Sequence, residues 1–424
     1  MRKWWYFALS VLLLLPVYWQ PRLQAGDLAE HLDNAWLPQL IETGRAQGMT
    51  MLRQTTNLLF DLMMKALFRV SNAEIAQRLS VSIAVLIFVW GAFRFISVVA
   101  GRPAWHMLPC IAMLAYGWVF HMGFFNFYMG MGLCFWALAA AWEWRPRWAL
   151  FTVPLLALAY VAHALPVMWT VALLLYQWIA RRMSPRARLL VTGGWLALLI
   201  LAQVALGRIF LATWSPAQIK MVTGADQVWV FDAKYYAILM GLLIVWGLLF
   251  LDLLKHTGAR GVMFSVPFQF CVISAAAVLI LPTAVLLPGS RHTLIYIAER
   301  MSLGVGICVC ALLAAARPRA SHRYAMVLVA FMFFTFLYRD ERLSNAVSSR
   351  IDAVISRAVM PGSEAGEATC LAPMPCPEAP VRDFAVIATT SHIADPRGAT
   401  TLGAGFLASR DAANRPLDLN RNGH

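Results

Sequence analysis

Apolar runs of about 20 residues recur along most of the chain, and they constrain the fold more than any other feature. As α-helices, runs of this length cross the hydrocarbon core of a membrane, which is about 30 Å thick. About eleven such runs are present, which predicts an all-α polytopic membrane protein. The expected spans are 4–19, 77–99, 105–121, 127–142, 148–162, 165–180, 188–212, 235–254, 262–287, 293–316 and 323–338.

Composition excludes two other classes of protein. Hydrophobic residues make up 60% of the chain and charged residues only 13%, which does not suit a soluble globular protein. A net charge of +14 would suggest nucleic-acid binding in a soluble chain. Here the basic residues cluster in short loops between the apolar runs, where they act as topology signals. We therefore expect no nucleic-acid partner.

The distribution of these basic residues predicts the orientation of the chain, because cytoplasmic loops are enriched in arginine and lysine. If the N-terminus is inside, the inside loops hold Arg102, Arg145, Arg147, Arg181, Arg182, Arg186, Arg188, Lys255, Arg260, Arg317, Arg319 and Arg323. The short outside loops then hold Lys220, Lys234 and Arg291. We expect the N-terminus inside and the C-terminus outside.

The chain divides into two expected regions. Residues 1–338 would form the transmembrane domain, in which residues 21–75 make a long outer loop of juxtamembrane helices. After Tyr338 the sequence becomes polar and loses its apolar period. We expect residues 339–424 to form an outer C-terminal tail, helical as far as Val359 and partly disordered beyond it.

The most unusual stretch lies directly behind the first apolar run, from Gly26 to Asn34. At helical spacing, Asp27, Glu30, His31 and Asn34 fall on one face. Asp27 and Glu30 also have the spacing of a capping box, in which both carboxylates satisfy the first amides of a helix. Capping leaves His31 and Asp33 unexplained. We interpret Asp27, Glu30 and Asp33 as candidate catalytic carboxylates, with His31 and Asn34 as candidate substrate-binding residues.

Further candidate substrate-binding residues fall on the same outer side. An ionisable residue inside a span is costly and indicates function by default, although an internal ion pair or a snorkelling arginine would also explain one. Histidines at short outer turns could orient a phosphate or a sugar hydroxyl, or they could be interfacial anchors. The candidates are His121, Asn126, His163, Arg291, His292, Glu299 and Arg300. No nucleotide-binding glycine motif and no zinc-protease motif occurs in the sequence.

The layout resembles the GT-C superfamily of integral membrane glycosyltransferases. The matching elements are a first span, an outer loop that opens with an acidic residue (Asp27) on a juxtamembrane helix, a second amphipathic helix, many spans and an outer C-terminal segment. More narrowly, residues 26–37 look like the start of uncharacterised bacterial multispan proteins. The chain departs from the common Asp-Glu pair, since Leu28 follows Asp27. The second acid would then be Glu30 or Asp33.

The resemblance implies a function at the outer face of a bacterial inner membrane, in the cell envelope. Asp27 would act as the base or the charge stabiliser at the acceptor, and the donor would be a polyprenyl-phosphate-linked sugar. The acceptor would be a glycan, a lipid or a protein, and the need for a divalent metal stays open. Two other classes also stay open: a transporter or flippase with the same residues along its path, and a non-catalytic membrane assembly protein.

Overall fold

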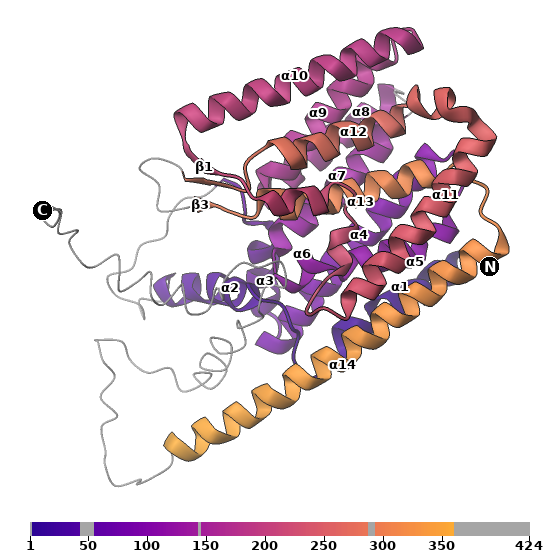
Figure 1. Ribbon diagram of the computed structural model, residues 1–424. Helices are drawn as coiled ribbons and strands as arrows, with labels where there is room; N and C mark the ends of the chain where they lie inside the picture. The colour runs from indigo at the N-terminus through magenta and orange to yellow at the C-terminus, as the bar shows by residue number, and fades with distance from the viewer. Residues whose placement is uncertain (1, 43–54, 143–145, 287–292, 360–424) are drawn as a thin grey trace, which may run out of the picture.

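The computed structural model describes residues 2–42, 55–142, 146–286 and 293–359 (Figure 1). Helices dominate these residues, as expected for an all-α membrane protein. The α-helices are α1 (Arg2–Tyr18), α2 (Leu28–Glu42), α3 (Leu59–Phe68), α4 (Ala73–Val99), α5 (Leu108–Ala115), α6 (Trp118–His121), α7 (Phe125–Ala141), α8 (Pro146–Ala162), α9 (Ala164–Ala180), α10 (Pro185–Ile209), α11 (Tyr235–Met263), α12 (Val266–Ile280), α13 (Ile297–Leu313) and α14 (Ala320–Val359).

Four of the described helices are long and apolar enough to cross a membrane: α4, α10, α11 and α14. Five shorter apolar helices accompany them, namely α1, α7, α8, α9 and α12. These helices support the prediction of a helical membrane protein, while the number of spans stays a prediction.

The expected span over 105–121 is divided into a 3₁₀ turn (η1, Trp105–Met107), α5 and α6. The break occurs where another segment reaches the bundle interior, the 3₁₀ turn η3 (Ala225–Val228). Gln227 is fully buried, and its side-chain oxygen accepts the Val119 amide at 3.2 Å. Its Nε2 donates to the Glu299 carbonyl at 2.8 Å. A segment expected in an outer loop therefore joins α6 to α13.

The centre of the bundle is the packing of α4 on α7 and of α7 on α8. Glycines allow the first of these pairs to approach closely, since a Cβ on Gly132 would lie 2.7 Å from Cα of Phe88. A Cβ on Gly91 would lie 2.5 Å from the Gly132 carbonyl oxygen. Small residues at such contacts are typical of helix packing in membranes.

Three short strands join the ends of α10, α12 and α13. β1 (Leu211–Thr213) pairs antiparallel with β2 (Ala284–Leu286), and β2 pairs antiparallel with β3 (Thr293–Leu294). The next element after β3 is α13, so the small sheet fixes where that helix begins.

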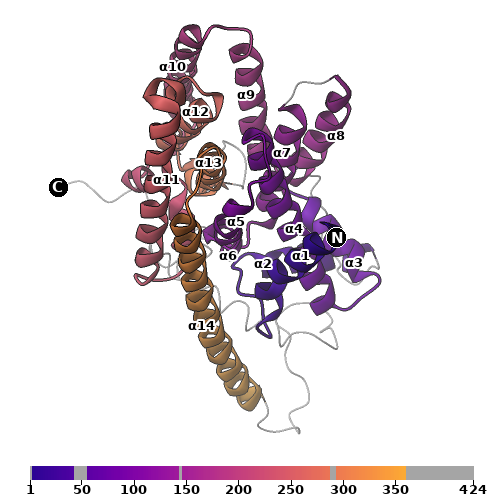
Figure 2. The same ribbon diagram turned by 90° about the vertical axis from the view of Figure 1, so that its right-hand side faces the viewer.

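Two parts of the fold position the candidate site. α2 and α3 lie at the end of the bundle opposite the N-terminus (Figure 1). The helix α14 continues across the expected boundary at residue 338, and its C-terminal half extends beyond the helices around its first half (Figure 2). Residues 360–424 of the expected tail lie outside the residues that the structure describes.

Candidate functional site

Asp27 is fixed at the start of α2 by the turn that joins α6 to α7. The amides of Gly26 and Asp27 donate to the carbonyls of His121 and Met122, at 2.8 and 2.9 Å. Gly123 makes this docking possible, because it has φ +80° and a Cβ there would lie 2.4 Å from the Asp27 nitrogen. The next residue along the turn, Phe124, contacts Arg300, which is the second component of the site.

Arg300, in the first turn of α13, lies over the Phe124 ring with 3.7 Å between its guanidinium carbon and the ring centroid. This is a cation–π contact, which orients the guanidinium but supplies no hydrogen-bond acceptor. Its Nη1 lies 3.5 Å from Nε2 of His163. Its Nε is buried and has no hydrogen-bond partner among the described residues.

His163 is the N-cap of α9, and its Nδ1 accepts the Leu165 amide at 3.1 Å. Burial, and then the charge of Arg300, lower the pKa of His163 to about 3, so the imidazole is neutral at pH 7. Because Nδ1 is an acceptor, the single ring proton belongs on Nε2. An N–H of His163 and the guanidinium of Arg300 therefore face each other as two donors. An anion between them would satisfy both.

The Asp27 carboxylate lies within electrostatic range of Arg300. Burial, and then the charge of Glu30, raise the pKa of Asp27 to about 6, against the lowering effects of His31 and Arg300. The Asp27 carbonyl accepts the His31 amide at 3.1 Å, so the backbone begins the helix as an N-cap does. No described backbone amide donates to its carboxylate, and the side chain is only partly buried. Such a carboxylate can accept a proton near neutral pH.

The other residues of the acidic face have different surroundings. Glu30 and Asn34 are exposed, and Asp33 is partly buried. Burial, and then the charge of Glu30, raise the pKa of Asp33 to about 6. Glu30 thus acts on both neighbouring carboxylates through its charge.

His31 turns away from the site into a buried ion pair. Its Nδ1 lies 2.6 Å from Oδ1 of Asp61, and its Nε2 lies 3.0 Å from the Gly123 carbonyl oxygen. Both ring nitrogens face acceptors, so the imidazole is protonated. Burial lowers the pKa of His31, but the hydrogen bond and charge of Asp61 outweigh it and raise the pKa overall. Asp61 was not predicted as a site residue. An aspartate inside the apolar run 58–64 is unusual, and this position could have identified it.

Asn126 completes this ion-pair cluster. Its Nδ2 donates to Oδ2 of Asp61 at 3.1 Å, and its Oδ1 accepts the Phe60 amide at 2.8 Å. The cluster of His31, Asp61 and Asn126 links α2, α3 and α7. Its hydrogen bonds are all made inside the protein, which indicates a structural role.

His121 belongs to another buried pair, at the contact with α14. Its Nε2 lies 3.2 Å from Oε1 of Glu341, and its Nδ1 lies 3.1 Å from the Gly117 carbonyl oxygen. The indole N–H of Trp19 donates to the second oxygen of Glu341. His121 therefore anchors α14 instead of facing Asp27.

The predicted site residues thus separate into groups. Arg300 lies against His163 and within electrostatic range of Asp27, and the helix α2 that follows Asp27 carries Glu30 and Asp33. Glu299 is buried, and its backbone carbonyl accepts Gln227 and Ser302. Arg291 and His292 lie outside the residues that the structure describes. Within the described ranges, no group of three or more His, Cys, Asp or Glu side chains has an arrangement that could hold a metal ion.

Comparisons with protein-family models, curated protein sequences and solved structures found no match to this chain. The geometry of Asp27, His163 and Arg300 is therefore the basis for its proposed function.

Proposed function

We propose that the protein is a membrane glycosyltransferase, which moves a sugar from a polyprenyl-phosphate-linked donor to an acceptor hydroxyl at the outer face of the membrane. The observation that carries this proposal is the pair of facing donors on Arg300 and His163, with the Asp27 carboxylate within electrostatic range of Arg300. Such a site offers an anion subsite and a base within one small region.

The donor phosphate would lie between Arg300 and His163. A guanidinium and an imidazole N–H both donate to phosphate oxygens, and charge-assisted hydrogen bonds of this kind are strong. Phosphate binding would occupy the buried Nε of Arg300, which has no partner among the described residues. The neutral state of His163 leaves one positive charge to balance the phosphodiester.

Asp27 would act on the acceptor. The acceptor oxygen forms a bond to the anomeric carbon, the bond from that carbon to the phosphate oxygen breaks, and the lipid phosphate leaves. The acceptor proton passes to the Asp27 carboxylate, for which a pKa of about 6 is well placed near neutral pH. Glu30 helps to hold that pKa above the usual range, and Asp33 is a second carboxylate on the same helix.

The number of spans and the sides of the two termini are part of the same proposal. About eleven spans, with the N-terminus in the cytoplasm and the C-terminus in the periplasm of a bacterial inner membrane, would place Asp27 at the outer face. A lipid-linked donor suits that face, because it reaches the site through the membrane.

Kinetics of an Arg300 variant test this proposal. The measurement is sugar transfer from a polyprenyl-phosphate-linked donor by purified protein in liposomes. The wild type should transfer the sugar, and Arg300→Gln should lower kcat/KM at least about tenfold, since it loses a charged hydrogen bond worth roughly 1.5–3 kcal/mol. Arg208→Gln is the matched control, because Arg208 is an exposed arginine near the end of α10.

Two results would count against the proposal. Equal kcat/KM for Arg300→Gln and Arg208→Gln would remove Arg300 from donor binding. A wild type that transfers no sugar from any such donor, but moves the lipid across the bilayer, would favour the flippase alternative.

A further inference from the structure

A second polar region lies at the other end of α1 and α4 from Asp27, around Arg102. A cavity of about 660 Å³ opens there, between the end of α4 and the start of α14. No carboxylate lines it, and its polar lining consists of Arg102, His106, Arg317 and Arg323. Such a concentration of positive charge favours an anionic ligand.

No described carboxylate neutralises the three arginines of this cavity, and one of them is held in position by backbone carbonyls. Arg102 donates to the carbonyls of Ala314 and Ala316, at 3.3 and 2.5 Å, which holds it beside the end of α13. Arg317 and Arg323 are exposed and form no ion pair with any residue that the structure describes. Arg319, on the same connection, differs because it lies 3.7 Å from a carboxylate oxygen of Asp252. Arg102, Arg317 and Arg323 thus line the cavity without an acidic partner among the described residues, although a carboxylate lies close by on α11.

His106 supplies a second and independent observation. Its Nε2 is buried and has no hydrogen-bond partner within the described part of the chain. An imidazole beside three guanidinium groups can complement them as a hydrogen-bonding group to the same ligand. A polar atom left without a partner beside three arginines points to a missing ligand.

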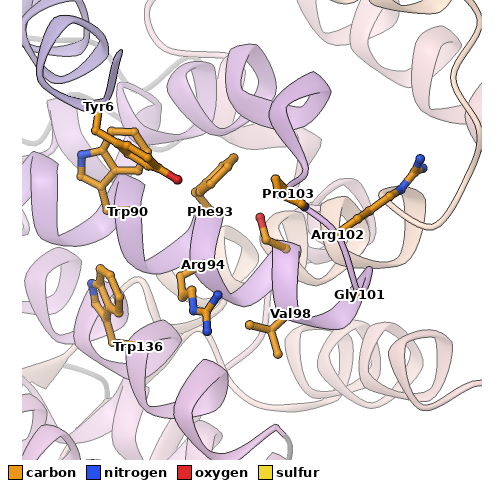
Figure 3. Close-up of a pocket in the computed structure, with 10 residues that line it drawn as sticks. Tyr6, Trp90, Phe93, Arg94, Val98, Gly101, Arg102, Pro103 and Trp136 are labelled. Carbon is orange, nitrogen blue, oxygen red and sulfur yellow. The ribbon is translucent and has the colours of Figure 1, made fainter. Parts of the chain in front are cut away.

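An apolar groove continues from the basic cavity. An adjoining cavity of about 680 Å³ shares Arg102 and Pro103 with it, and Tyr6, Trp90, Phe93, Val98 and Trp136 supply most of its other walls (Figure 3). A third cavity of about 430 Å³ also touches Pro103, and is lined by Trp5, Tyr6, Leu9 and Trp105. The three cavities meet at Pro103. Together they form one continuous space, with arginines at one end and aromatic side chains along the rest.

Arg94 adds a charge to the aromatic part. It lies inside α4, and Figure 3 shows its guanidinium between Trp136 and Val98. Arg94 is exposed and pairs with no carboxylate among the described residues. Arginine inside an apolar helix is costly unless a polar or anionic group accompanies it.

We propose that these joined cavities bind an anionic phospholipid, with its phosphate between Arg102, Arg317 and Arg323 and an acyl chain along the aromatic groove. Arginine suits phosphate because its planar group donates two hydrogen bonds at once. Basic pockets between transmembrane helices are known to bind lipid headgroups. The positive-inside rule explains basic residues here, but it requires neither a cavity nor the buried Nε2 of His106.

Lipid binding by the purified full-length protein tests this proposal. The double variant Arg317→Gln/Arg323→Gln is compared with the wild type, using native mass spectrometry in detergent with phosphatidylglycerol, cardiolipin or phosphatidylcholine as the probe. The control is Arg182→Gln/Arg186→Gln, which removes the same charge from exposed positions just after α9 and in the first turn of α10. Both pairs are exposed, so thermal unfolding without added lipid should show that both variants fold.

The wild type should prefer the two anionic lipids to phosphatidylcholine, and the Arg317→Gln/Arg323→Gln variant should bind them about 30-fold more weakly. The control should bind as the wild type does. An equal loss in both variants would overturn the proposal in favour of general surface charge. Full displacement of the lipid by inorganic phosphate would overturn it in favour of a site for free anions.

Discussion

Asp27 and Asp61 show how two carboxylates on neighbouring helices acquire different roles from their surroundings. Asp61 is buried against the imidazolium of His31 and the amide of Asn126, so both of its oxygens have donors. The Asp27 carboxylate accepts no hydrogen bond from a described residue, and burial together with the charge of Glu30 raises its pKa to about 6. Fully paired carboxylates stabilise structure, whereas unpaired ones with raised pKa values are typical of functional sites.

The substitution Asp61→Asn should destabilise the protein, because it leaves the His31 imidazolium buried without a counter-charge. Breaking a buried ion pair on one side costs about 3–5 kcal/mol. Thermal unfolding in detergent should therefore show a large drop in the unfolding temperature. Asp232→Asn is the control, since that side chain is 58% exposed and surface pairs contribute little. If both variants unfold at the wild-type temperature, the cluster of His31, Asp61 and Asn126 is not structural.

Single residues were predictable from the sequence where their chemistry was unusual for their position. Asp27 and Arg300 were predicted from charge close to apolar runs, and His163 from its place at a turn. Their convergence could not be predicted, because it depends on the Gly123 turn and on the Phe124 ring between α2 and α13. Sequence spacing placed His31 on the face of Asp27, but the Asp61 carboxylate on α3 draws it away.

Among the helices, α14 connects the membrane bundle to the start of the first loop. Glu341 accepts from Trp19 and faces His121, and Asn345 exchanges two hydrogen bonds with the Arg22 backbone, at 2.9 and 3.1 Å. These contacts lie beyond residue 338, where the sequence suggested a polar tail. The polar residues of this segment are therefore an interface with residues 19–22 and 121.

Two truncations test this role of α14. A chain that ends after Val359 should fold as the full-length protein does, because residues 360–424 offer little apolar sequence to bury. A chain that ends after Tyr338 should unfold at a lower temperature, because it leaves the buried His121 and the half-buried Trp19 without Glu341. The measurements are size-exclusion chromatography and thermal unfolding in detergent. Identical behaviour of the two truncations would contradict the interface.

The sequence predicted helices well where an apolar run stands alone, as for α4 and α11. It predicted one span over 105–121 because hydropathy does not reveal where a separate segment enters the bundle. Gln227 is polar and lies in a loop sequence, yet it is fully buried with hydrogen bonds to α6 and α13. A buried amide of this kind can be recognised only from its partners.

At the scale of the whole molecule, the two polar regions lie at opposite ends of α1 and α4. In the proposed topology, the positive-inside rule assigns the Arg102 end to the cytoplasm and would place Asp27 outside. Reporter fusions after Arg182 and after Arg342 should therefore report opposite sides of the membrane. Reporters on the same side would contradict this orientation and the outer location of the site.

The most direct test of the proposed function is the pH dependence of sugar transfer by the wild type and by Asp27→Asn. Asparagine keeps the size and the capping ability of aspartate but cannot accept the proton. The wild-type rate should fall as the pH drops below about 6, because protonation of Asp27 removes the base. Asp27→Asn should transfer roughly 10²–10⁴-fold more slowly at pH 7.5, without that step in its profile. A variant that matches the wild type in rate and in pH profile would contradict the role of Asp27.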